Sequence, residues 1–544
     1  MRARQTLLMF GILALAAVTS LGQAKRASGR GEHAQSTSLQ AVGSQQVEGN
    51  DLVKVGFHNL GGGGFNGDVW GQGNFVYVGT FGVAEEGLCL GTGVKVVDIS
   101  NPAAPVMVTT LSVPDGSHPS DVKVASISTG SFQGDLLVNS NEACAFGGFS
   151  GVQLWDVRDP RNPSELGRFA TAGVHNAYLY QKNDRAYTLL AVQFAEVFGP
   201  PAGLPGSDLQ IVDVTDPTNP VLVGEWTIGR DAGLAFGSPG LEGIPDLPPG
   251  SDCTPPPETP PLCRGQAIAG VYLHDVWASQ DGDVAYLAYW DAGLITLDIS
   301  DPANPTLLGV ATEPLSDEGN AHVAVADELG TLILVGDEDF EPGPWGFLRV
   351  FDGSDLTNPV QLATFATDNA LAASPPDDGF YTMHNAVIEG STAYISWYSD
   401  GVRVVDLSEP SVPTEVASFV PPDVPDPNGY FPPKALVWGV FVQDELIFAS
   451  DINSGLYVLA FDRDGDGCAD IEELPCLGPT VGDVDCNSDV NSIDAALVLQ
   501  FDAGLIATLP CLPAGDVNGD SEINSIDAAL ILQFTAGLLS SLPP

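Results

Sequence analysis

Oxygen-bearing side chains recur at alternate positions in two short runs near the C-terminus. In each run, Asp, Asn or Glu occupies positions 1, 3, 5, 7, 9 and 12 of a twelve-residue loop. Because Ca2+ takes six to eight oxygen ligands and this spacing wraps them around one ion, the pattern predicts two EF-hand-like calcium sites. Glu522 is expected to offer its backbone carbonyl. The expected ligands are Asp483, Asp485, Asn487, Asp489, Asn491 and Asp494 in the first loop, and Asp516, Asn518, Asp520, Glu522, Asn524 and Asp527 in the second.

Each of these loops is followed by nearly the same helix-like run, IDAALVLQFDAGLI from Ile493 and IDAALILQFTAGLL from Ile526. Two such loop-helix repeats, with Asp and not Glu at position 12, resemble a type I dockerin over about residues 480–544. The resemblance implies a calcium-dependent docking module that binds a cohesin-like module on a scaffold protein. It also implies that loop positions 10 and 11 contact the partner, and these positions are Ser492, Ile493, Ser525 and Ile526.

A third acidic run precedes the paired loops. It has Gly467 at position 6 and Glu at position 12, but no amphipathic helix follows it. It looks like a calcium-rigidified linker of the thrombospondin type 3 kind, and an acidic turn without metal is the alternative. In the paired loops, Ser488 and Ser521 replace the glycine usual at position 6, which we expect to weaken calcium affinity somewhat. The expected linker ligands are Asp462, Asp464, Asp466, Cys468, Asp470 and Glu473.

The chain before this tail is built from a recurring unit. One copy reads GVKVVDISNPAAPVMVTTL from Gly93 and another reads GLITLDISDPANPTLLGVA from Gly293. Each copy joins two apolar strands through a turn rich in Asp, Asn and Pro, and a second pair of strands lies upstream. Four antiparallel strands per unit, at a period of roughly 40–65 residues, predict the blades of a β-propeller. Six copies begin at Gly93, Gly151, Asp208, Gly293, Phe347 and Gly401.

A seventh, degenerate unit begins at Trp438 and lacks an outer strand of its own. The run DLVKVGFHNL from Asp51 has the pattern of the outer strands, so we expect residues 52–58 to complete this last blade. Such closure would leave no open sheet edge in the ring. The sequence therefore predicts seven blades closed by the N-terminal strand.

The strands VKVVD, LQIVD and VRVVD match the name of the LVIVD repeat family, which this region resembles over most of residues 51–461. The resemblance implies an exported propeller-like protein, but no common activity. The expected fold class is all-β, a seven-bladed β-propeller followed by a small α-helical EF-hand-like domain. The expected domains are a signal peptide (1–24), a flexible segment (25–50), the propeller (51–461), a calcium-binding linker (462–479) and the dockerin-like domain (480–544).

Polar residues at the starts of the inner strands should meet around one mouth of the propeller channel. Acidic loops such as that at Asp337, Glu338 and Asp339 should reach the same face. A ring of imidazoles and oxygens could hold a metal or a sugar. The alternative is that these side chains only satisfy backbone groups and recur because the blade recurs. The residues in question are Asp68, Asp121, His175, Asn176, His274, Asp275, His322, His384 and Asn385.

The eight cysteines predict disulfides, because the chain has an export signal. Cys89 and Cys144 fall in the same loop of successive blades, so we expect them to pair, since a metal-ligand role for them lacks suitable histidine neighbours. Cys253 and Cys263 bracket a Pro-rich insertion and should staple it. In the tail, the expected pairs are Cys468 with Cys476 and Cys486 with Cys511.

The N-terminus reads as a secretory signal. Arg2 and Arg4 precede an apolar run over residues 7–18, and cleavage is expected after Ala24. No other stretch is long and apolar enough to cross a bilayer, so we expect a secreted protein, in solution outside the cell or at its surface. With 19 basic against 70 acidic residues and a formal net charge of −51, the chain should repel nucleic acid.

The function expected from these features is display of a recognition module, through dockerin-cohesin docking, in an extracellular or cell-surface assembly. The propeller's ligand would be a carbohydrate or a protein. One alternative is a polysaccharide-degrading enzyme of the glycoside hydrolase type, with an acidic pair such as Asp337 and Asp339 flanking the bond. Another is a surface-layer structural protein. No nucleophile, phosphate-loop or Cys-His motif is recognisable, so no catalytic residue is assigned.

Overall fold

The computed structural model describes residues 51–82, 89, 93–145, 147–192, 206–232, 272–311, 319–340, 344–462, 469, 481–485, 490–506, 508–520, 522–539 and 541–542. The chain divides into two compact units, and the division falls inside the paired strands β1 and β29. No helix of the described residues is long and apolar enough to span a membrane. Outside the described residues lie the signal peptide, Asp464, Asp466, Cys468, Asp470, Glu473, Cys476, Cys486, Asn487, Asp489, Cys253 and Cys263.

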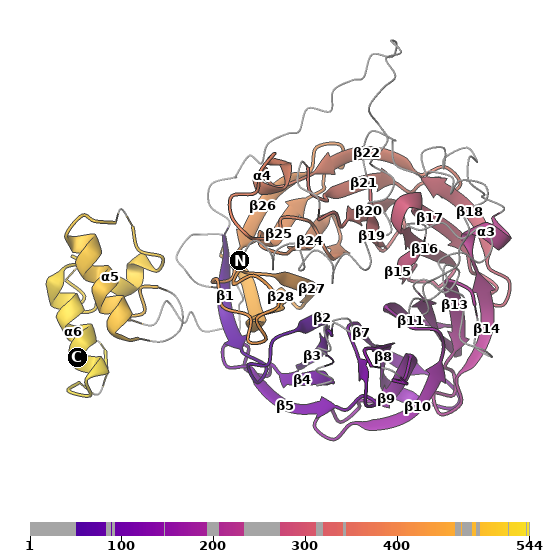
Figure 1. Ribbon diagram of the computed structural model, residues 1–544, viewed down its shortest axis with the longest axis horizontal. Helices are drawn as coiled ribbons and strands as arrows, with labels where there is room; N and C mark the ends of the chain where they lie inside the picture. Colours follow the sequence, from indigo (N-terminus) through magenta and orange to yellow (C-terminus); the bar gives the residue numbers. More distant parts are fainter. Residues whose placement is uncertain are drawn as a thin grey trace, which may run out of the picture. The chain divides into compact units, whose positions relative to one another are not determined.

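The first unit is a ring of seven antiparallel sheets around a central axis (Figure 1). In each sheet a strand at one edge lies innermost and the strand at the other edge lies on the outside of the ring. The first blade comprises β2 (Asn66–Gln72), β3 (Phe75–Thr80), β4 (Val94–Asp98) and β5 (Val106–Leu111). The second comprises β6 (Ser117–His118), β7 (Val122–Ser128), β8 (Gln133–Ala143), β9 (Gly151–Asp156) and β10 (Ser164–Ala170). The third comprises β11 (Asn176–Lys182), β12 (Arg185–Ala191), β13 (Leu209–Asp213) and β14 (Val221–Trp226).

The remaining four blades follow the same order, except that the last takes its outer strand from the N-terminal side. The fourth blade comprises β15 (Leu273–Ala278), β16 (Val284–Tyr289), β17 (Gly293–Asp298) and β18 (Thr306–Ala311), and the fifth comprises β19 (Ala321–Ala326), β20 (Leu332–Asp337), β21 (Leu348–Asp352) and β22 (Val360–Phe365). The sixth comprises β23 (Ala386–Glu389), β24 (Thr392–Trp397), β25 (Gly401–Asp406) and β26 (Thr414–Phe419). The seventh comprises β27 (Val437–Gln443), β28 (Leu446–Asp451), β29 (Gly455–Asp462) and β1 (Asp51–His58).

The order β1-β29-β28-β27 confirms that the N-terminal strand completes the last blade. Gly56 in β1 lies so close to the turn of the next blade that a Cβ would overlap the carbonyl oxygen of Pro102. Gly224 in the outer strand β14 has the same relation to Pro302 in the following blade. The seam of the ring is therefore packed like an ordinary junction between blades, and the glycine permits this close approach.

The aspartate that ends each repeat strand has a structural role in the turn. The Oδ1 atom of Asp98 accepts a hydrogen bond from the backbone N–H of Ser100 at 2.8 Å, and Asp298 accepts one from Ser300 at 2.8 Å. Such Asx turns fix the chain reversal between the third and fourth strands. The recurrence of this aspartate is therefore explained by turn geometry, without a ligand.

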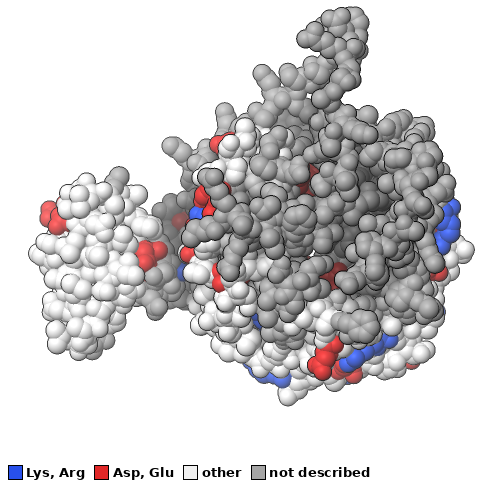
Figure 2. All heavy atoms as spheres, viewed as in Figure 1, with Lys and Arg blue, Asp and Glu red and all other residues white. Residues whose placement is uncertain are grey.

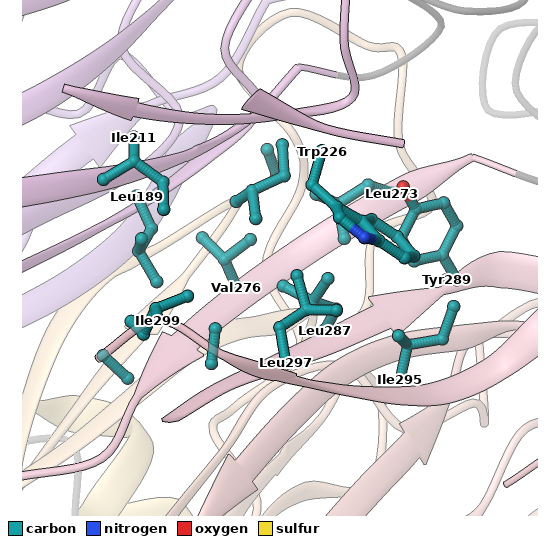
Figure 3. Close-up of a cluster of buried hydrophobic side chains, with 14 of the residues drawn as sticks. Leu189, Ile211, Trp226, Leu273, Val276, Leu287, Tyr289, Ile295, Leu297 and Ile299 are labelled. Atoms are coloured by element: carbon teal, nitrogen blue, oxygen red, sulfur yellow. The ribbon is translucent and has the colours of Figure 1, made fainter. Parts of the chain in front are cut away.

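Apolar side chains fill the space between adjacent blades because both faces of each sheet are covered. In Figure 3, Leu189 and Ile211 of the third blade face Val276 and Leu287 of the fourth across such an interface. Trp226 on the outer strand is also fully buried in this cluster. Truncating one of these large side chains to Ala would cost about 2–5 kcal/mol. Packing of this kind holds the inner strands, and hence the axial side chains, in fixed positions.

The predicted disulfide between Cys89 and Cys144 is present, with a Cα–Cα distance of 5.2 Å. It joins the segment between β3 and β4 of the first blade to the residue after β8 of the second. Cys511 is also disulfide-bonded. Its predicted partner, Cys486, lies outside the described residues.

The second unit contains two longer helices. The short helical segments in the described part of the propeller are α3 (Ile228–Asp231), η2 (Trp290–Ala292) and α4 (Asp368–Leu371). In the tail, α5 (Ser492–Asp502) and α6 (Ser525–Thr535) follow the two predicted calcium loops, and η3 (Leu512–Gly515) lies between them. Their small core includes Val484, Val498, Val517 and Ile531. The repeated loop-helix pattern of the sequence is thus matched by a repeated local structure.

Charged side chains on the propeller surface are exposed, whereas those on its axis are buried. In Figure 2, the visible Lys and Arg side chains lie mainly at the propeller's edge, several of them beside acidic side chains. One such pair in the outer strand β10 is Arg168 with Glu165, with an Nη2–Oε2 distance of 2.8 Å. Exposed pairs of this kind add little stability. The buried axial charges described next are of a different kind.

Candidate functional site on the propeller axis

One position near the start of each inner strand faces the axis. Several of the carbonyls at these positions are bonded by the preceding blade, as when Asp68 N donates to Ser120 O at 2.8 Å and Ser396 Oγ donates to Trp438 O at 2.7 Å. This shared bonding brings equivalent side chains of successive blades into contact. The equivalent residues are Gly67, Ser120, His175, His274, His322, His384 and Trp438.

Four of these residues, His175, His274, His322 and His384, and Trp438 beside them form a continuous series of rings. Their successive ring centroids are 4.5, 3.9, 4.1 and 4.3 Å apart. Phe81 and His118 fill the positions left by the small residues, with centroid distances of 4.9 Å from Phe81 to Trp438 and 5.5 Å from Phe81 to His118. We call these seven rings the histidine belt. It holds five of the chain's seven histidines.

Glu142 closes the belt between its two ends. Its Oε2 atom lies 3.0 Å from Nδ1 of His175 and 3.8 Å from Nε2 of His118. Burial alone would lower the pKa of His175, but the Glu142 carboxylate outweighs this and raises it. His175 is therefore held by a carboxylate, in contrast to the three histidines that follow it in the belt.

Backbone carbonyls fix the tautomers of the next histidines. Nδ1 of His274 lies 3.0 Å from the carbonyl of His322, and Nδ1 of His384 lies 2.7 Å from the carbonyl of Trp438. A carbonyl only accepts, so each Nδ1 carries the proton and each Nε2 keeps a lone pair. His322 interacts in a similar way with the backbone of His384. Among the described residues, however, its Nδ1 atom has no partner within hydrogen-bond geometry.

Glu338, directly after β20, meets these Nε2 atoms. Its Oε2 lies 3.7 Å from Nε2 of His322 and its Oε1 lies 3.8 Å from Nε2 of His384. Tyr398 donates its hydroxyl to Oε1 of Glu338 at 2.6 Å. Single ligand atoms of His274, His322 and Glu338 lie within 4.8 Å of one another. This is the arrangement in the propeller best suited to a cation.

Burial controls the charges in this group. It lowers the pKa of His384 to about 3, and it lowers the pKa of His274 and of His322 well below the usual value, with the neighbouring histidines adding to the effect. Burial also raises the pKa of Glu338 to about 7. The three imidazoles are therefore neutral at physiological pH, which is the form that binds metal ions.

The predicted aspartates lie one residue further along the inner strands, around a lysine. Lys123 Nζ is 2.8 Å from Oδ2 of Asp68 and forms a second ion pair with Asp121. Burial opposes ionisation of Asp68, but Lys123 outweighs it and lowers the pKa, whereas burial raises the pKa of Asp121 and Asp275 to about 7. Asn385 donates to Oδ1 of Asp68 at 3.2 Å.

Aromatic rings occupy the axis beyond this acidic layer. Trp70 and Trp277 lie 6.2 Å apart between ring centroids, Trp70 and Phe441 4.3 Å, and Tyr178 and Trp277 4.2 Å. Each belongs to an inner strand, two residues beyond the acidic layer in sequence. Lys123 Nζ lies 5.2 Å from the Trp70 centroid. The axis is therefore layered, with histidines, then charged groups, then aromatics.

The structure brings together most of the predicted propeller residues, but in separate groups. His175, His274, His322 and His384 share the belt, while Asp68, Asp121, Asp275 and Asn385 surround or adjoin Lys123, and Asn176 donates to the carbonyl of His274 at 3.1 Å. The sequence analysis did not select Lys123, Glu142 or Tyr398. The position of Lys123 in VKVAS, on the inward face of an inner strand, was the available signal for the lysine.

The acidic pair considered for glycosidic chemistry is poorly placed for it. Asp337 is fully buried, and its Oδ2 accepts from Nε of Arg349, also fully buried, at 2.9 Å. A carboxylate held by a buried guanidinium is stabilised in its charged form and is shielded from a polysaccharide chain. Asp337 therefore acts as a structural ion-pair partner.

In the first tail loop, Asp494 joins the loop to α5. Its Oδ1 accepts from Val484 N at 3.0 Å and its Oδ2 accepts from Asn491 N at 2.8 Å. Carboxylate oxygens of Asp483, Asp485 and Asp494 lie within 4.8 Å of one another. Three of the predicted ligands of this loop therefore lie close together, as the sequence pattern requires.

The second tail loop repeats these contacts around Asp527. Its Oδ1 accepts from Val517 N at 2.9 Å and its Oδ2 accepts from Asn524 N at 2.9 Å. Within the loop, Asp520 N donates to Oδ1 of Asn518 at 2.8 Å and to Oδ1 of Asp516 at 3.0 Å. Glu522 N donates to Oδ1 of Asp520 at 2.9 Å. Asp494 and Asp527 thus make equivalent contacts in the two loops.

Comparison with known proteins supports the repeat. A family model described as the LVIVD repeat matches residues 63–113, 205–227, 272–312 and 384–420, so the chain contains LVIVD repeats. The β-propeller domain of Cps50 (Swd1) from Myceliophteria thermophila is 13% identical, with 73% of this chain and 96% of that chain covered and a TM-score of 0.43. Raptor from Chaetomium thermophilum is 11% identical, with 76% and 29% covered and a TM-score of 0.44. No curated protein sequence gives a significant match.

Proposed function

We propose that this LVIVD-repeat propeller protein is a secreted modular protein whose tail binds two Ca2+ ions and docks to a cohesin-like module. The propeller is the recognition module that the tail displays, and its ligand is a carbohydrate or a protein. The observation that carries the proposal is the repetition, atom for atom, of the contacts of Asp494 by Asp527. Two matching oxygen-rich loops, each leading into a helix, support a calcium-binding pair better than two chance acidic turns.

The exposed surface of the tail supports docking. Ile493 is 58% exposed and Ile526, at the equivalent place in the second half, is 56% exposed. Leu505 and Leu538 are each 75% exposed and also occupy equivalent places. Large apolar side chains left on a surface in matching sets favour a protein partner. Their repetition means that either half offers a similar surface to a cohesin-like module.

A recognition role for the propeller is supported over polysaccharide cleavage. Asp337, one member of the acidic pair considered for cleavage, is engaged by Arg349, and the acidic layer on the axis is engaged by Lys123. We therefore expect a glycan array to report binding without release of reducing sugar. Turnover of a bound polysaccharide would favour the enzyme alternative instead.

Calorimetric titration of the full chain with Ca2+ tests the tail. We expect the paired loops to contribute two sites, with Asp483→Ala and Asp516→Ala each removing one, whether or not the linker binds a further ion. Asp184→Ala, which changes an exposed aspartate of the propeller, is the matched control and should keep both. A type I cohesin module should bind the wild-type chain only when Ca2+ is present. Unchanged stoichiometry in both loop variants would contradict the proposal.

A further inference from the structure

We propose that His274, His322, His384 and Glu338 form a binding site for one divalent transition-metal ion of the Zn2+ type on the propeller axis. The site lies among residues of three neighbouring blades, since His274 belongs to the fourth blade, His322 and Glu338 to the fifth and His384 to the start of the sixth. It goes beyond the proposed docking function and does not depend on the calcium loops.

The distances in this group are close to those of a coordinated ion. Bonds of 2.0–2.1 Å in a tetrahedral site place ligand atoms roughly 3.4 Å apart. The two oxygens of Glu338 lie 3.7 Å from Nε2 of His322 and 3.8 Å from Nε2 of His384. These separations are too long for hydrogen bonds, which require about 2.7–3.2 Å. To hold one ion, the ligand atoms of His274, His322 and Glu338, which lie within 4.8 Å of one another, would draw closer together. His384, which lies outside that group and approaches the other oxygen of Glu338, would move further.

A buried polar atom without a hydrogen-bond partner supports a metal ion at this position. Nε2 of His384 is buried and makes no hydrogen bond among the described residues, although it faces Glu338. A buried polar atom without a partner costs about 1–3 kcal/mol. A metal ion would accept its lone pair and remove that cost. Hydrogen bonds of Nδ1 to backbone carbonyls hold His274 and His384 in the tautomer that a metal requires.

The donor set selects the class of metal. Imidazoles are borderline donors, and three of them with one carboxylate suit Zn2+, Co2+ and their neighbours, whereas Ca2+ prefers oxygen ligands alone. The hydroxyl of Tyr398 orients Glu338 by a hydrogen bond of 2.6 Å, as partners of metal-binding carboxylates commonly do. Four protein ligands fill a tetrahedral shell, so the ion would join blades and carry no open position for chemistry.

The test is a Co2+ titration of the metal-stripped full chain, followed by its visible absorption, with millimolar Ca2+ present to saturate the tail. We expect one equivalent of Co2+ to give the intense bands of a four-coordinate site, Zn2+ to displace it, and Zn2+ to raise the melting temperature of the propeller. His322→Gln should weaken binding by at least about 100-fold, and the positioning variant Tyr398→Phe by about 10-fold. His58→Gln, on the outer strand β1, is the matched control and should bind as the wild type does.

Absence of these bands in the wild-type chain would overturn the proposal, and so would equal binding by His322→Gln and wild type. Circular dichroism of each metal-free variant establishes that it is folded. If His322→Gln does not fold, the near-isosteric Glu338→Gln provides the same test. The intense Co2+ bands report a four-coordinate site, unlike the six to eight oxygens of a calcium loop, so they would appear even if the tail bound no Ca2+. Their absence would leave the docking proposal intact.

Discussion

The propeller axis and the tail loops both gather groups that bind cations, but they do so by different means. On the axis, packing between large sheets holds the side chains, neutral tautomers avoid repulsion between histidines, and Lys123 compensates neighbouring carboxylates. In the tail, a small apolar core supports loops whose carboxylates lie close together, as Asp483, Asp485 and Asp494 do. Bringing like charges together is unfavourable without a counter-ion.

On the axis, the fold would hold the ligands in place before a cation binds. In the tail, the cation would help the loops to fold. The propeller can form its axial arrangement from apolar burial, backbone hydrogen bonds and the Lys123 ion pairs, so a metal there would add to an existing structure. The tail has little apolar burial to offset its charge repulsion, so Ca2+ binding should supply part of its folding free energy. The two regions should therefore respond differently to strand loss, disulfide loss and chelation.

The largest effect expected is loss of the propeller when its closing strand is removed. A chain beginning at residue 59 lacks β1 and exposes the edge of β29. An ordinary domain has a free energy of unfolding of about 5–15 kcal/mol, and we expect the truncation to remove a large part of it. The reference is a chain beginning at Asp51. Calorimetry should show a sharp fall in the propeller melting temperature, and equal melting temperatures would contradict ring closure.

Removing the Cys89–Cys144 disulfide should destabilise the propeller without affecting the tail. The bond closes a sequence separation of 55 residues. Chain-entropy arguments give a loss of about 4 kcal/mol for a loop of this length, less any strain relieved. The double variant Cys89→Ser with Cys144→Ser should unfold at lower denaturant concentration, while Ca2+ stoichiometry stays at two. A change confined to Ca2+ binding would contradict the separation of the two regions.

Docking should tolerate damage to one half of the tail but not to both. Ser492→Glu with Ile493→Glu should leave cohesin affinity within about 2-fold, because the second half offers the same surface. Adding Ser525→Glu with Ile526→Glu should weaken binding by at least about 100-fold, close to 3 kcal/mol. Surface plasmon resonance with a type I cohesin module measures both. Equal losses for the two halves separately would mean that both are used at once.

The smallest effect expected concerns a buried charge in the propeller. Burial lowers the pKa of Lys95 to about 8, and its Nζ donates to Asn66 at 2.6 Å. The unfolded chain therefore binds more protons above pH 8, so the contribution of Lys95 becomes more favourable as pH rises. Between pH 7.5 and 9.5, the stability of wild type relative to Lys95→Met should improve by about 2 kcal/mol. A constant difference in urea denaturation would contradict this.

The sequence predicted the propeller well because its evidence was repeated. Six copies of one strand-turn-strand unit indicated the blades, and the unpaired pattern at Asp51 indicated closure. The Cys89–Cys144 pair followed from topology, since equivalent loops of successive blades must be neighbours. These inferences depend on repeated patterns of apolar and turn-forming residues, which can be read directly from a sequence.

The axial site was predicted only in part because its details depend on side-chain direction. Histidines at inner-strand starts could be placed near the axis, but not their tautomers, which depend on carbonyls of the next blade. Glu338 was placed only on the same face, and Tyr398 gave no signal because it lies 60 residues away in sequence. Lys123 pairs with Asp68 and Asp121, so these aspartates form a group separate from the histidines, a division that residue types alone do not reveal.

Thermal unfolding of the full chain, first stripped of transition metals and then compared in Ca2+ with and without excess EGTA, tests the contrast between the two regions most directly. Circular dichroism follows the helical signal of α5 and α6, and calorimetry follows the propeller. We expect EGTA to remove the helical signal and its transition while the propeller melting temperature stays the same, because only the tail needs Ca2+ to offset its carboxylates. Helicity indifferent to EGTA, or a propeller transition that falls with it, would contradict the account.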